Sequence, residues 1–290
     1  MKTKLKTETK IVAGIEYQLP KVYLLQETGI GTAEFAARTC YDSFNKSENE
    51  SVKYTEAQIL IGNVPDTDRL NDIEHSDLLN DLAWTYFHHS ILEHAVLTYA
   101  IKGTSRGVLQ EHARHRIQAI SVQSTRYTMS PIINAFVACM PLCDKETFES
   151  ILAKLDFLVL ENDAKYLEIS QIWDKLWLQV NEIGEEEFLK LALSKPNLEK
   201  YHTTGFTAKP EELFFELQNG KAKRNVGDNF KWLVTDNWKV DMVVTFNLRS
   251  LKNYFTLRDN GAAYWQIQEL AKAMKAVTPK KYLDLIVKDK

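Results

Sequence analysis

The chain has 290 residues, of which 44% are hydrophobic and 26% charged, with only 11 Gly and 7 Pro. This composition excludes collagen-like, disordered and small disulfide-rich proteins, and the formal net charge of -3 excludes a generally basic nucleic-acid binder. The longest unbroken apolar run, Ala135–Met140, is far shorter than the ~20 residues of a membrane-spanning helix. The N-terminus lacks the apolar core of a signal peptide. The three cysteines form no C-x-x-C pair, which predicts reduced thiols in a cytoplasmic protein.

Residue patterning in the first half of the chain predicts both strands and helices. Residues 11–28 read as two short strands broken at Pro20, and Thr32 is suited to cap a helix that follows it. The period of apolar residues predicts a helix over 77–88 that ends at His88 and His89. A buried strand is expected over 95–103, followed by a helix from Arg106 to about Arg116 with Ser105 as its cap.

The second half is predominantly helical. Residues 144–181 predict one or two long helices, whereas 194–236 mix Gly, Pro and charges and favour no assignment. Two further helices, 250–258 and 262–277, should be hinged at Asn260–Gly261, with Gly261 as a left-handed C-cap. The side chains expected in the core include four aromatic residues and all three cysteines: Trp84, Tyr86, Phe87, Tyr99, Cys40, Cys139 and Cys143.

Positive charge is concentrated in one short segment of this acidic chain. Four of the nine arginines lie within 21 residues, and five of the seven histidines lie just before or among them: Arg106, Arg114, Arg116, Arg126, His88, His89, His94, His112 and His115. On a helix, Arg106, Gln110 and Arg114 would share one stripe. The segment is either a solvated basic face or the binding site of an anionic ligand.

Two other interpretations concern the histidines. A metal site at His112 and His115 is disfavoured because the flanking arginines would repel the cation, so we expect no metal. His94 is equally consistent with a structural histidine and with a ligand contact.

The spacing within this segment is more specific than its charge. Arg114-His115-Arg116 is followed after seven residues by Ser124, and then by Arg126 and Tyr127. This resembles the R-H-R-x7-S signature of the flavin-dependent thymidylate synthases, which continues as x-R-Y. Four more segments are similar to blocks of that family, in the same order: AARTCY (36–41), HHSILEH (88–94, family pattern H-x-[ST]-x-x-E-H), Ser105-Arg106 with Glu111, and NLRSLKNYFTLR (247–258, family pattern N-x-R-S-L-x-N-[FY]-[FL]-x-L-R).

The resemblance implies an α+β fold with a small central sheet and long helices. It implies a single catalytic domain over 1–290, with a longer insertion over about 144–235, assembled as a homotetramer with sites shared between chains. The implied reaction is the reductive methylation of dUMP to dTMP. Methylenetetrahydrofolate would donate the carbon and NADPH-reduced FAD the hydride, with no nucleic-acid or membrane partner.

The resemblance also implies roles for individual residues. Those expected to meet dUMP are Arg106, Gln110, Glu111, Ser124, Arg126, Tyr127 and Arg258. Those expected to meet FAD are His88, Ser90, Glu93, Arg114, His115, Arg116, Ile117, Asn247, Arg249 and Asn253. Arg258 is the catalytic candidate because a fixed cation can stabilise charge that develops on the uracil ring. Ser124 occupies a nucleophile's position, but its neighbours Gln123 and Thr125 supply no base, which favours a binding role.

Several positions depart from the family pattern, including Tyr264 in place of a common Gln and Val234-Thr235 in place of a Leu-Pro pair. Val122 lies where many members carry Glu or Gln, and Ala262 lies where many carry His. A second hypothesis is therefore a non-catalytic or altered-chemistry relative that binds a nucleotide, or a nucleic acid, through the same basic cluster. Weak flavin binding with retained dUMP affinity would distinguish it from a working enzyme.

Overall fold

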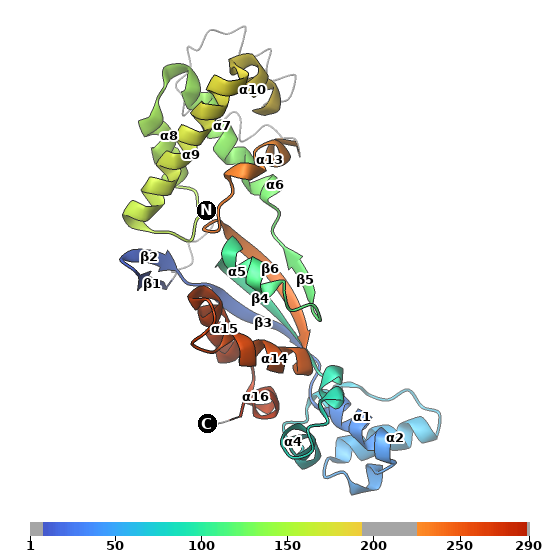
Figure 1. Cartoon of the computed structure of the whole chain (residues 1–290). Coiled ribbons are helices and arrows are strands. Elements are labelled where there is room, and N and C mark those ends of the chain that lie inside the picture. The colour runs from blue at the N-terminus through green and yellow to red at the C-terminus, as the bar shows by residue number, and fades with distance from the viewer. Residues whose placement is uncertain (1–7, 193–224, 289–290) are drawn as a thin grey trace. The chain divides into compact units, whose positions relative to one another are not determined.

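The computed structural model describes residues 8–192 and 225–288, and these fall into two compact units (Figure 1). The first, the helical unit, comprises Met1–Gln18, Ser105–Gly107 and Gln123–Val240; the second, the sheet unit, comprises Leu19–Thr104, Val108–Val122 and Asp241–Lys290. Residues 193–224, within the expected insertion, lie outside the described residues. No described helix is both long and apolar enough to cross a membrane.

A four-stranded sheet in the order β3-β4-β6-β5 forms the centre of the sheet unit. Its strands are β3 (Lys21–Glu27), β4 (Val96–Ser105), β5 (Ala119–Val122) and β6 (Lys239–Asn247). β3 pairs antiparallel with β4, and β5 pairs antiparallel with β6. Alternate residues of β4 and β6 are buried, as expected for strands with one face in the core, so the predicted strand over 95–103 is confirmed.

The sheet unit also contains eight α-helices and two short 3-10 helices among its described residues. They are α1 (Gly31–Tyr41), α2 (Glu50–Leu60), α3 (Asp68–Asn71), α4 (Asp77–Trp84), α5 (Arg106–His112), α14 (Leu248–Arg258), α15 (Trp265–Val277) and α16 (Lys280–Ile286), with short 3-10 helices η1 (Phe44–Lys46) and η2 (His89–His94). α15 packs along β3 and against α14 (Figure 1).

Several predicted helix ends are wrong by a few residues. α1 includes Thr32 rather than being capped by it, and α4 ends at Trp84 rather than at His88. α14 ends with Asp259 as its C-cap, and Gly261 is not among the residues with positive φ. These ends depend on caps and packing that the periodicity of apolar residues does not encode.

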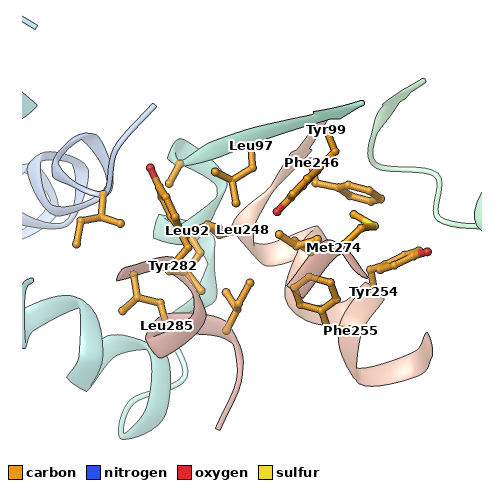
Figure 2. Packing of buried hydrophobic residues seen from close by; sticks show 14 of the residues in the cluster. Leu92, Leu97, Tyr99, Phe246, Leu248, Tyr254, Phe255, Met274, Tyr282 and Leu285 are labelled. Atoms are coloured by element: carbon orange, nitrogen blue, oxygen red, sulfur yellow. The ribbon is translucent and has the colours of Figure 1, made fainter. Parts of the chain in front are cut away.

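The core of the sheet unit joins the sheet to α14, α15 and α16. Figure 2 shows its large side chains: Leu92, Leu97, Tyr99, Phe246, Leu248, Tyr254, Phe255, Met274, Tyr282 and Leu285. Two tyrosine hydroxyls in this core have partners: the Tyr99 hydroxyl lies 2.8 Å from Thr278 Oγ1, and the Tyr282 hydroxyl accepts from the Gly29 N–H. Tyr86 and Phe87 are more than 60% exposed, so their predicted burial is wrong, whereas Tyr99 is fully buried as predicted.

The helical unit contains one hairpin and a bundle of helices. β1 (Thr9–Val12) and β2 (Ile15–Gln18) pair antiparallel. Ala13 and Gly14 between them have φ of 51° and 82°, which matches a two-residue hairpin turn. The predicted break at Pro20 and the strand after it, β3, are confirmed, but the single strand predicted before Pro20 is wrong, because this turn divides it into β1 and β2.

The helices of this unit enclose an aromatic core. They are α6 (Thr125–Thr128), α7 (Ser130–Cys139), α8 (Lys145–Ala153), α9 (Asn162–Ile183), α10 (Glu185–Ala192) and α13 (Asn225–Asn229), with 3-10 helices η3 (Met140–Leu142) and η4 (Lys231–Leu233). The predicted helices over 144–181 correspond to α8 and α9. Phe136 packs edge-on against Trp173 and Phe188, with ring centroids 5.1 and 5.3 Å away.

The three cysteines are free, but only Cys139 is buried. Cys40 lies on an exposed face of α1, and Cys143 is the left-handed residue that ends η3. The prediction that all three are core thiols is therefore wrong for Cys40 and Cys143.

Candidate ligand-binding site in the sheet unit

The sheet unit contains a cavity of about 850 Å³ between three segments that are distant in sequence. The segments are η2, the turn that follows α5, and α14. The lining residues are His89, Glu93, Arg114, His115, Arg116, Ile117, Arg249, Ser250, Lys252, Asn253, Thr256, Leu257 and Arg258. The cavity thus brings together seven of the ten residues expected to meet FAD, and Arg258 with them.

The start of α14 explains how one wall is built. The Asn247 side chain accepts a hydrogen bond from the Ser250 N–H at 2.8 Å, so it caps the helix. Arg249, Asn253 and Leu257 then recur every four residues and share one face of α14. The structure therefore places Asn247 as the N-cap of the helix that presents Arg249 and Asn253.

The opposite wall comes from the turn between α5 and β5. α5 ends at His112, whose carbonyl accepts from the His115 N–H and from the Gln118 side chain, both at 3.1 Å. The predicted helix to Arg116 is wrong, and so is the helical stripe through Arg114. Arg114 and Arg116 instead lie in the turn, where both side chains are exposed at the cavity.

Positive charge in the cavity exceeds its negative charge. Arg249 Nη1 pairs with Glu93 Oε1 at 2.5 Å, and Arg258 pairs with Glu111. Among the described residues, Arg114, Arg116 and Lys252 have no carboxylate partner. Three uncompensated cations beside one cavity favour an anionic ligand.

Lys252 is a cavity residue that the sequence analysis missed. Its Nζ lies 3.7 Å from the centroid of the Trp84 ring and 3.2 Å from His89 Nε2. Burial lowers the pKa of Lys252. The sequence could have indicated Lys252 as a cavity residue, because it follows Arg249 by three residues and the two side chains therefore lie next to each other on one helix face.

Arg258 is held at the cavity wall by three hydrogen bonds. Its Nε donates to His115 Nε2 at 2.8 Å, Nη1 to Glu111 Oε2 at 2.8 Å, and Nη2 to the Glu111 carbonyl at 3.1 Å. Burial, followed by the charge of Arg258, lowers the pKa of His115 to about 4. The pKa of His112 is also lowered to about 4, by burial first, then by the charge of the neighbouring His115, and then by the charge of Arg258.

A second cavity of about 330 Å³ lies next to the first and contains His88 and Ser90. His89 and Arg249 line both cavities. Phe87, at a left-handed φ of 56°, comes just before His88, whose Nδ1 lies 3.4 Å from the Tyr41 hydroxyl. Two of the remaining residues expected to meet FAD are therefore adjacent to the main cavity.

The residues expected to meet dUMP are divided between the two units. Gln110, Glu111 and Arg258 belong to the sheet unit, while Arg106, Ser124, Arg126 and Tyr127 belong to the helical unit. The Tyr127 side chain lies outside the described part of the structure.

In the helical unit, Ser124 caps α6 and its Oγ accepts from the Arg126 N–H at 3.3 Å. Arg126 is half exposed and its Nε donates to Asp228 at 2.6 Å. Gly227 allows this approach, because a Cβ there would lie 2.3 Å from the Arg126 Cα. Asp228 was missed because the sequence over 194–236 favoured no assignment. No cluster of metal-ligating side chains occurs among the described residues.

Comparison with known proteins identifies the family. Residues 24–282 match the family model described as thymidylate synthase complementing protein. The chain belongs to this family. A flavin-dependent thymidylate synthase from Wolinella succinogenes is 29% identical over 90% of this chain and 94% of its own length, and one from Campylobacter jejuni is 28% identical over 90% and 93%. A solved flavin-dependent thymidylate synthase from Helicobacter pylori, complexed with FAD and dUMP, is 26% identical with a TM-score of 0.54, covering 92% of this chain and 98% of that one.

These findings confirm the family, the α+β fold and the enzyme class that the sequence predicted. The protein is an FAD-dependent thymidylate synthase of the thymidylate synthase complementing protein family. Among the departures from the family pattern, Val122 lies on β5 and packs against the core of the sheet unit. Ala262 is exposed after α14, where its N–H donates to Asn260 Oδ1. Neither residue lines the main cavity.

Proposed function

We propose that this thymidylate synthase converts dUMP to dTMP with methylenetetrahydrofolate as the carbon donor and NADPH as the reductant of FAD. The observation that carries the proposal is the cavity in which unpaired cations and a fixed Arg258 lie together. Such a wall suits ligands that combine phosphate groups with a flat polar ring. The roles of individual residues follow from this wall.

The residues of the main cavity fit FAD. Its volume of about 850 Å³ lies in the usual range for cofactor sites. Arg114 and Arg116 would bind the pyrophosphate, while Glu93, His115, Ile117, Arg249 and Asn253 would contact the rest of the molecule, with His88, Ser90 and Asn247 close to it. When bound, FAD supplies a two-electron carrier that takes hydride from NADPH and delivers it to the one-carbon unit.

The dUMP residues divide by chemistry. Ser124 and Arg126 bind the phosphate, supported by the exposure of Arg126 and by its Nη atoms, which have no partner among the described residues. Arg106, Gln110 and Tyr127 complete the nucleotide contacts. Glu111 and Arg258 face the uracil edge. C5 of uracil can attack the methylene carbon when the ring gains enolate character, with negative charge on a carbonyl oxygen, and the Arg258 guanidinium would stabilise that charge without a proton transfer. Once the methylene carbon is bonded to C5, the C5 hydrogen leaves as a proton and the bond from that carbon to the tetrahydrofolate nitrogen breaks, so that tetrahydrofolate is the leaving group.

We also propose a homotetramer located in the cytoplasm. Ile117 and Leu257 at the cavity are 70% and 48% exposed, and Tyr264 is 44% exposed, so apolar surface is available beside the site for a second chain. The three free cysteines are consistent with a reducing compartment.

The visible spectrum of the purified protein tests the cofactor assignment. Protein loaded with FAD and desalted should keep its flavin absorption, and anaerobic NADPH should bleach it. Retained dUMP binding without flavin binding would favour instead a non-catalytic nucleotide-binding relative.

A further inference from the structure

The hydrogen bonds of Arg258 define the protonation state of His115. Arginine has donors only, so His115 Nε2, which lies 2.8 Å from Arg258 Nε, must carry a free lone pair. The imidazole is therefore neutral, with its proton on Nδ1. The lowered pKa of His115 agrees with this state, because burial and the charge of Arg258 both oppose a second proton.

Packing holds the His115 ring in place. The residue is 9% exposed, and its ring lies 4.7 Å from the ring of Tyr254 in an edge-on contact. Tyr254 is fully buried and its hydroxyl lies 3.1 Å from His112 Nδ1. The His115 N–H also donates to the His112 carbonyl, so both the backbone and the ring of His115 are fixed.

Glu111 holds the other end of the guanidinium. Its carboxylate accepts from Nη1 and its carbonyl accepts from Nη2. The guanidinium has five N–H groups, of which these contacts use three. One N–H on each Nη atom remains for a substrate, which gives a pair of donors in a fixed direction.

We propose that Glu111 and His115 are positioning residues that orient the Arg258 guanidinium before substrate binds, with His115 acting as a neutral acceptor in its Nδ1–H form. The family resemblance assigns Glu111 to dUMP and His115 to FAD, but the geometry gives each a partner within the chain. His115 Nδ1 has no partner among the described residues and remains for a ligand in the cavity that His115 lines. The inference rests on the proposed function only for the role of Arg258.

Hydrogen exchange of the Arg258 Nε–H tests the contact without any assay of activity. In FAD-loaded protein labelled with 15N-arginine, the Arg258 signal is identified by its loss in Arg258→Lys. We expect His115→Leu, which has no acceptor, to speed exchange of this proton at least about tenfold. His115→Gln, which retains an acceptor, should keep most of the protection. Unchanged exchange in His115→Leu would overturn the proposal.

Kinetics then separate positioning from general stability. His115→Leu and Glu111→Gln should each lower kcat about tenfold, with a smaller change in the KM for dUMP, and His115→Gln should stay within about threefold of wild type. In the Arg258→Ala background the same substitutions should cost less than about twofold, because the group they orient is gone. Losses that simply multiply would contradict the proposal.

A matched control is Glu50→Gln, which removes a carboxylate from an exposed ion pair with Lys53. It should change neither exchange nor kcat. If Arg258 is protected but the wild-type protein makes no dTMP, the proposed function fails and the positioning contact stands. If dTMP forms while His115→Leu leaves the exchange of the Arg258 Nε–H unchanged, the proposed function stands and the positioning role of His115 fails.

Discussion

Replacing Arg258 by Ala removes a charge that the reaction needs chiefly in its transition state. Loss of one preorganised electrostatic donor usually lowers kcat by about 100- to 1000-fold, or ~3–4 kcal/mol of barrier. Binding of ground-state dUMP relies on other residues as well, so its Kd should change by less than about tenfold. Turnover should therefore fall much more than affinity.

The structure indicates that this loss will not come from unfolding. The side chain of Arg258 is 15% exposed and that of Glu111 is 40% exposed, so breaking their ion pair should cost only about 1 kcal/mol of stability. The pKa of His115 should rise in Arg258→Ala but stay below its ordinary value, because burial is the larger cause of its shift. Arg258→Lys, which keeps the positive charge but lacks the planar guanidinium, should have a kcat between those of the wild type and Arg258→Ala.

The assay compares initial rates of dTMP formation at saturating dUMP with the Kd for dUMP from equilibrium dialysis. Thermal unfolding of each variant checks that it is folded. Wild-type turnover by Arg258→Ala at saturating dUMP would refute the catalytic role of Arg258.

Three further predictions concern other parts of the chain. Arg126→Ala should weaken dUMP binding by ~1.5–3 kcal/mol and leave FAD bound. The control Arg69→Ala, which removes an equally exposed arginine paired with Asp66, should change the affinity for neither dUMP nor FAD. Unchanged dUMP affinity in Arg126→Ala would remove Arg126 from the phosphate site. The pKa of His112 is about 4 in the folded chain against 6.5 for the free group, so the unfolded chain binds more protons between these two pH values. Above pH 6.5 His112 therefore does not change the free energy of unfolding. As the pH falls from 6.5 to 4, it lowers the free energy of unfolding by on the order of 3 kcal/mol in total. Denaturant unfolding across this range should show a shallower pH slope for His112→Asn but not for the exposed His94→Asn, and identical slopes would contradict the assignment. Finally, single replacement of Cys40, Cys139 or Cys143 by Ala or Ser should keep dTMP formation within about tenfold, since the mechanism needs no thiolate; a folded variant that binds FAD and dUMP but makes no dTMP would indicate covalent catalysis instead.

The sequence predicted the elements that carry a clear period and missed those decided by local geometry. The strand over 95–103 and the helix after Asn247 were recognisable because their apolar residues alternate or recur along one face. The early end of α5 was not, because it depends on His115 and Gln118 donating to the His112 carbonyl.

The grouping of cavity residues followed from motif spacing, but their contacts with one another did not. The R-H-R block and the block after Asn247 each pointed to a ligand, and the structure brings both to one cavity. Nothing in the spacing shows that Arg258 is bound to His115 and Glu111, because that contact joins residues more than 140 positions apart. The exposure of Cys40 was missed as well, because the last residue of α1 that is buried is Arg38, two positions before it.

The most direct test of the proposed reaction is release of tritium from [5-3H]dUMP, because methylation at C5 must expel that hydrogen. Purified protein should release tritium and form dTMP in equal amounts when FAD, NADPH and methylenetetrahydrofolate are all present. Omission of NADPH or methylenetetrahydrofolate should abolish dTMP, and protein stripped of FAD should regain activity when FAD is restored. Formation of dTMP by flavin-free protein, or none by FAD-loaded protein with every co-substrate, would contradict the account.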